Sequence, residues 1–112
     1  MLTVRELSKK CGLTVLTCED ELDREICGCY VGDLLSWVMG RAKADDAWLT
    51  VMGNINSIAV ATLADVACIV LTENAALDAA AKAKAEQQGV AILQTELNSY
   101  ELAVKISKLL EA

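Results

Sequence analysis

The residues best suited to bind a ligand lie in the segment Gly53-Asn54-Ile55-Asn56-Ser57. A flexible glycine, two side-chain amides and the free N–H groups of a helix start can hold a phosphate or a nucleotide. The spacing and the lysine of a P-loop are missing. We therefore treat Gly53, Asn54, Asn56 and Ser57 as candidate ligand-binding residues, and an ordinary strand-to-helix turn is the alternative.

Thr72 and Arg24 are two further candidates for the same ligand. Thr72 follows the apolar run 67–71, and Arg24 lies in a segment dense in carboxylates, residues 19–25. Arg24 could bind an anion, but an internal ion pair that orders the turn is the commoner role of such a residue. The acidic segment lacks the alternating Asp/Asn spacing and the central glycine of a calcium loop.

The cysteines offer a weaker signal for chemistry. Cys27 and Cys29 form a C-x-C pair, which Cys11 and Cys18 could extend, but there is no C-x₂-C pair and no histidine. We expect no metal and no cofactor, and a thiol redox switch at Cys27 and Cys29 is the alternative. An odd number of cysteines, five, without a signal peptide indicates reduced thiols in a cytoplasmic protein.

Composition excludes several classes of function. The absence of histidine excludes Ser-His-Asp and Cys-His catalysis, so we expect no enzyme. Lys and Arg total 10 against 16 Asp and Glu, a formal charge of −6, which argues against nucleic-acid binding. The uncharged residues 49–64 include a glycine and two asparagines, so we expect no membrane span.

Alternating strands and helices must position the candidate residues. Thr3 and Glu6 form a capping box, Asp33 is expected to cap a helix over 34–43, and a helix over 57–64 follows the candidate turn. Asp78 and Gly89 bound an Ala-rich helix, and Asn98 or Ser99 caps the last helix. Strands are predicted over residues 14–17, 26–31, 48–52, 67–71 and 90–93.

This order predicts an α/β fold, a three-layer sandwich in which helices cover both faces of a mostly parallel five-stranded sheet. We expect a single domain over residues 1–112. Ligands of such sheets bind beyond the carboxyl ends of the strands. Those ends are residues 32–33, 53–54, 72–74 and 94–96.

The predicted helix over 34–43 is apolar over too wide an arc. At 100° per residue, its apolar residues span roughly 200°, more than one sheet face requires. Leu34, Trp37, Val38 and Met39 are therefore candidate interface residues. A long neighbouring loop that covers them is the alternative.

Two short motifs carry a family resemblance. Asp23-Arg24 and Gly28-x-Tyr30-x-x-Asp33-Leu34-Leu35-Ser36 resemble the signature of DRTGG domains, although residues 25–27 replace the Thr-Gly-Gly that names the domain. Such domains resemble the N-terminal module of HPr kinase/phosphorylase and occur inside CBS-containing pyrophosphatases. The resemblance implies an accessory or regulatory module that self-associates and is not itself a catalyst.

The leading hypothesis is thus a non-catalytic regulatory or accessory domain, a homodimer that senses a nucleotide or a phosphorylated metabolite. The alternative is a subunit that binds a metabolic or redox enzyme through the Trp37 surface and takes no small-molecule ligand. A phosphate-transferring enzyme is the third hypothesis, and the absence of a P-loop and of histidine argues against it.

Overall fold

The computed structural model describes residues 1–112, in which five strands form one sheet in the order β2-β7-β6-β5-β4. Strands β4 to β7 are parallel, and β2 pairs antiparallel with β7. None of the helices is both long and apolar enough to cross a membrane. The elements are β1 (Leu2–Thr3), α1 (Val4–Lys10), β2 (Thr14–Val15), β3 (Glu25–Ile26), β4 (Gly28–Val31), α2 (Leu35–Arg41), β5 (Asp46–Thr50), α3 (Ile55–Ala64), β6 (Cys68–Leu71), α4 (Ala79–Gln88), β7 (Ile92–Gln94) and α5 (Ser99–Glu111).

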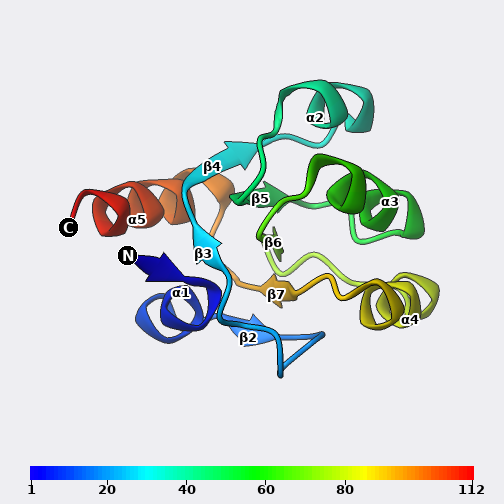
Figure 1. Ribbon diagram of the computed structural model, residues 1–112, viewed down its shortest axis with the longest axis horizontal. Helices are drawn as coiled ribbons and strands as arrows, with labels where there is room; N and C mark the ends of the chain where they lie inside the picture. The colour runs from blue at the N-terminus through cyan, green and yellow to red at the C-terminus, as the bar shows by residue number, and fades with distance from the viewer.

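The predicted α/β class, with its three layers and mostly parallel five-stranded sheet, is confirmed. Strands β4 to β7 follow one another across the sheet in chain order. Because parallel crossovers are right-handed, such an order places every crossover helix on the same face. Figure 1 shows α2, α3 and α4 on that face and α1 and α5 on the other.

The central strands are buried on both faces, as their unbroken apolar runs predict. In β6, Cys68 and Val70 pack toward α1 and α5. Ile69 and Leu71 of the same strand pack among residues of α2, α3 and α4. The sheet thus separates two apolar clusters of 16 and 11 buried residues, one on each face.

The predicted strand over 26–31 is wrong as a single element. It divides into β3, which pairs antiparallel with β1, and β4, which pairs with β5. Between them the Cys27 N–H donates to the Asp45 carbonyl at 2.9 Å, where the chain changes partner. Strand β1 has two residues, too few to show a periodic pattern in the sequence.

The prediction that Asp33 caps the following helix is also wrong. Its Oδ1 accepts hydrogen bonds from Thr50 Oγ1 at 2.7 Å and from the Val51 N–H at 2.9 Å. The N-cap position of α2 is Leu34, which gives no side-chain cap. Asp33 finds donors at the end of β5, a neighbour that the local sequence does not reveal.

Arg24 ties the amino ends of β5 and β6 together. Its guanidinium lies 2.9 Å from Asp45 Oδ1 and 3.0 Å from Asp65 Oδ1, and it donates to the Asp65 carbonyl at 2.6 Å. Both aspartates adopt left-handed backbone conformations, with φ of 67° and 58°. Partial burial lowers the pKa of Arg24, but the hydrogen bonds to the two aspartates outweigh this effect and raise it.

Gly53 lies where the segment after β5 meets the segment before α4. Its carbonyl accepts a hydrogen bond from the Asp78 N–H at 3.0 Å. A Cβ on Gly53 would overlap the main-chain carbonyl of Ala76. Close packing between two backbones therefore requires glycine at this position.

We predict that Arg24→Met lowers the free energy of unfolding by about 1–2 kcal/mol, because it leaves two left-handed aspartates without their common partner. Arg5→Met is the matched control. It removes one exposed ion pair, with Asp23 at 3.0 Å, and should cost less than about 1 kcal/mol. Urea denaturation measures both, and equal losses in the two variants would contradict the assigned role of Arg24.

We predict that Gly53→Ala destabilises the fold by about 1–3 kcal/mol, because a backbone carbonyl cannot move aside as a side chain can. Gly40→Ala is the control, since a Cβ on Gly40 would meet no atom within 4 Å. In the last turn of α2 that change should stabilise by up to ~1 kcal/mol. Thermal denaturation of the two variants, at dilutions where the chain is monomeric, should give shifts of opposite sign.

Candidate functional site

The turn between β5 and α3 uses its polar groups to build the fold. Asn54 Oδ1 accepts from the N–H groups of Asn56 and Ser57 at 3.0 and 3.2 Å, so it caps α3. The Ser57 hydroxyl, which is buried, donates to the Met52 carbonyl at 2.6 Å. A phosphate at this turn would have to displace the Asn54 side chain from both N–H groups.

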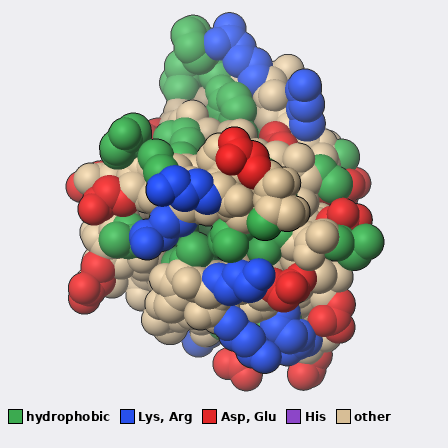
Figure 2. Space-filling model, turned by 90° about the vertical axis from the view of Figure 1, so that its left-hand side faces the viewer, with side chains coloured by type: hydrophobic (Ala, Val, Ile, Leu, Met, Phe, Trp, Pro, Cys, Tyr) green, Lys and Arg blue, Asp and Glu red, His purple; other side chains and the backbone are tan.

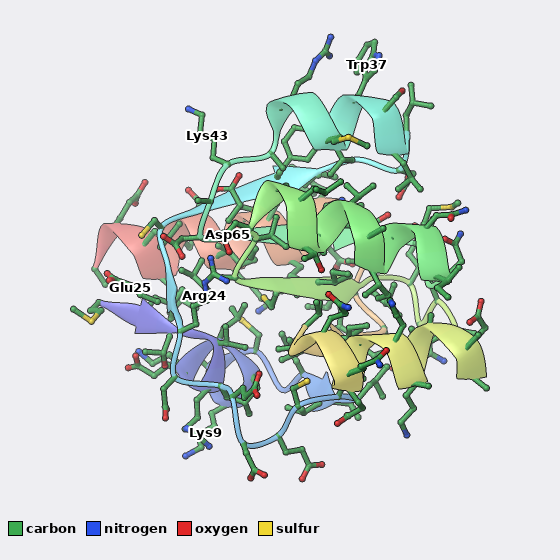
Figure 3. All side chains as sticks on the ribbon, turned by 45° about the vertical axis from the view of Figure 1, so that its right-hand side comes forward. Lys9, Arg24, Glu25, Trp37, Lys43 and Asp65 are labelled. Atoms are coloured by element: carbon green, nitrogen blue, oxygen red, sulfur yellow. The ribbon has the colours of Figure 1, made fainter.

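Thr72 and Arg24 do not join this turn in one site. Thr72 is fully buried, and its hydroxyl lies 2.8 Å from the Ser99 hydroxyl at the start of α5. Arg24 lies with Asp65 at the amino ends of the strands, the opposite edge of the sheet, as Figure 3 shows. The six predicted ligand residues are therefore spread over three places.

A hollow of about 400 Å³ does lie at the carboxyl ends of β6 and β7, the edge where ligands of parallel sheets bind. Its polar side chains are hydroxyl and amide groups with a single carboxylate, that of Glu96. Gln94 is held in place by a hydrogen bond from its Nε2 to the Ala75 carbonyl at 2.9 Å. The lining residues are Gly12, Thr14, Asn74, Gln94, Thr95, Glu96 and Leu97.

These groups suit the hydroxyl and ring nitrogen atoms of a sugar or base, because amides both donate and accept hydrogen bonds. No lysine or arginine lines the hollow, so a phosphate would have no cationic partner within it. The sequence marks residues 72–74 and 94–96 only as the carboxyl ends of predicted strands, not as a binding motif. Strand β2 and the turn at Gly12 close the hollow because β2 pairs antiparallel with β7.

A second hollow, of about 320 Å³, lies at the amino ends of the strands. Arg24 lines it together with the carboxylates of Glu21 and Asp65. Because the Arg24 guanidinium already pairs with Asp45 and Asp65, it is not free to bind an anion there. Arg24 does form ion pairs within the protein, but its partners are Asp45 and Asp65, which are distant in sequence, and not Asp23.

The cysteines lie in environments that suppress thiolate chemistry. Burial raises the pKa of the Cys29 thiol to about 11, and Asp46 adds to this effect. Burial likewise raises the pKa of Cys68 to about 12. Cys27 is exposed, and no group of three or more Cys, Asp or Glu side chains is arranged to hold a metal ion.

Helix α2 and its N-cap residue expose three large apolar side chains. Leu34, Trp37 and Met39 are 59%, 53% and 49% exposed, and Met39 lies about 160° around the helix from Trp37. Figure 2 shows hydrophobic side chains beside Lys and Arg side chains at the top of the molecule, where Figure 1 places α2. Val38 does not belong to this surface, because it is fully buried between α2 and the sheet.

Comparisons with known proteins agree with this architecture. The family model of the DRTGG domain matches residues 6–109. A search of curated proteins finds no match. Among solved structures, the chain is similar to the CBS and DRTGG domains of the regulatory region of Clostridium perfringens pyrophosphatase, complexed with the activator diadenosine tetraphosphate.

That structural similarity has a TM-score of 0.69 at 8% sequence identity. It covers 90% of this chain but only 44% of the pyrophosphatase chain, so the two share one fold and not a whole protein. The family match extends over nearly the whole sequence, including Arg24 and the residues of β4 and α2. The chain belongs to the DRTGG domain family.

Proposed function

We propose that the chain is a non-catalytic regulatory or accessory module of the cytoplasm, which forms a homodimer and senses a nucleotide or a phosphorylated metabolite. The observation that carries the sensing role is the hollow at the carboxyl ends of β6 and β7. The related pyrophosphatase region binds a dinucleotide activator, which supports the same ligand class.

The arrangement of polar groups favours a particular position for such a ligand. Its nucleoside would lie against Gln94 and Asn74, which offer amide donors and acceptors. The phosphates would extend toward solvent, because the hollow provides no cation for them. The cradle at Asn54 and Asn56 is the competing position, and there a ligand must replace an existing helix cap.

We predict that a thermal-shift screen with diadenosine tetraphosphate, ATP, AMP and inorganic phosphate finds a nucleotide that stabilises the protein. At a hundredfold excess over Kd the gain is ~2.7 kcal/mol. Gln94→Ala should abolish the shift and Asn56→Ala should retain it. The reverse pattern would place the ligand at the β5–α3 turn, and no shift with any probe would contradict the sensing role.

The homodimer is supported by the apolar surface of α2. An exposed tryptophan beside other apolar side chains is typical of protein interfaces, where Trp is enriched. The observation that favours this role is the 53% exposure of Trp37 on a helix that buries Val38 against the sheet.

We predict that sedimentation equilibrium gives twice the chain mass of 12.0 kDa at micromolar concentrations. Trp37→Ala should weaken association by at least tenfold, because a central tryptophan commonly contributes 2 kcal/mol or more. Leu63→Ala is the control, since Leu63 is 71% exposed but lies on α3. A monomer at several hundred micromolar would disprove the homodimer.

The same surface supports one alternative function. A subunit that binds a metabolic or redox enzyme would also expose Leu34 and Trp37, and it would need no small-molecule ligand. Two results together favour it: no thermal shift with any nucleotide, and a monomer that associates with another protein through Trp37.

A further inference from the structure

We propose that two copies of the chain pack α2 against α2 in antiparallel orientation, with the Trp37 ring of each copy seated on Gly40 of the other. This inference rests on the proposed homodimer and specifies its contact. It assigns a role to a glycine that nothing within one copy of the chain explains.

Gly40 lies in the last turn of α2, where glycine costs up to roughly 1 kcal/mol relative to alanine. Its backbone does not have a positive φ, and a Cβ there would meet no atom within 4 Å. Neither backbone conformation nor packing within one copy therefore requires a glycine. A helix glycine permits the close approach of another group to the backbone, and this position is open to solvent.

Trp37 and Gly40 share one side of α2. At 100° per residue, Leu34, Trp37, Gly40 and Arg41 fall within an arc of about 120°. Val38 faces the sheet, and α3 packs beside α2 on the other flank. Figure 3 shows Trp37 pointing away from α3, beyond the edge of the sheet. This side of α2 is the stripe that a second copy can reach.

The ring and the glycine make the stripe self-complementary. In an antiparallel pair related by a twofold axis, each contact occurs twice, so one ring-on-glycine contact implies a second. The Arg41 guanidinium lies 3.7 Å from the centre of the Trp37 ring and supports the ring in its exposed position. Val31, 49% exposed at the open edge of β4, adds to the apolar surface.

Charge fixes the orientation of the two helices. Asp33 precedes α2, while Arg41 ends it and Lys43 follows. An antiparallel pair centred between Trp37 and Gly40 brings residue 34 opposite residue 43, so Asp33 of each copy lies near Lys43 and Arg41 of the other. A parallel pair would place like charges together, which is unfavourable. The helix dipoles also favour the antiparallel arrangement.

The test is the variant Gly40→Ala, analysed by sedimentation equilibrium and by urea denaturation. It should stabilise the folded monomer slightly and yet raise the dimer Kd by at least tenfold, because the methyl group lifts the ring off the helix. Met39→Ala is the matched control: Met39 is 49% exposed on the same helix but lies about 160° around it from Trp37. Its dimer Kd should not change.

Tryptophan fluorescence gives a second readout in the unmodified chain. Trp48 is fully buried in one copy, so only Trp37 can change environment on association. Dilution through the Kd should shift the emission to the red and increase quenching by iodide. A dimer that Gly40→Ala leaves intact, or that forms without a change at Trp37, would overturn the proposed contact while leaving the homodimer standing. A wild-type monomer at every concentration would instead remove the homodimer itself.

Discussion

The sheet depends on the contact between one arginine and two aspartates. Arg24 precedes β3, whereas Asp45 and Asp65 precede β5 and β6, so one side chain joins three segments that are distant in sequence. Both aspartates hold left-handed conformations that non-glycine residues seldom adopt. The Asp45 N–H also donates to the Asp65 carbonyl at 3.0 Å, so the amino edge of the sheet forms one hydrogen-bonded unit.

The carboxyl edge of the sheet differs from the amino edge in the polar groups that it leaves open. Along the carboxyl edge, polar groups near α3 are also engaged in the fold: Asn54 caps the helix and Gly53 packs against Ala76. Beyond β6 and β7, the side-chain amides of Asn74 and Gln94 line an open hollow. The Asn54 amide oxygen already accepts two hydrogen bonds from the helix, whereas the Gln94 amide donates one to the Ala75 carbonyl and keeps its oxygen and a second N–H hydrogen for a ligand.

Helix α2 differs from the other helices in ways that point to one explanation. It has no side-chain cap, contains a glycine and exposes a tryptophan, whereas α3, α4 and α5 are capped by Asn54, Asp78 and Asn98. The missing cap and the glycine each lower the stability of α2 in one isolated copy. A partner on this side of the molecule would offset that loss, and natural sequences depart from local rules mainly at sites of function.

The sequence by itself determined the elements that have strong local signals. The capping box at Thr3, the stop at Gly89 and the buried run of β6 could all be read from neighbouring residues, because the interactions that define them span only a few positions. The cap of the last helix was narrowed to Asn98 or Ser99, and the structure shows Asn98. Their alternation was enough for the fold class, and two short motifs were enough to suggest the family.

The tertiary structure alone decided which partner each polar group takes. Asp33 bonds to Thr50 and Val51 in place of the helix that follows it, and Arg24 reaches Asp45 and Asp65 in place of its neighbour Asp23. The division of β3 from β4 and the hollow beside Gln94 depend on pairings with β1 and β2, strands of two residues each. Such contacts join residues far apart in the chain, and local pattern contains no information about the distances between them.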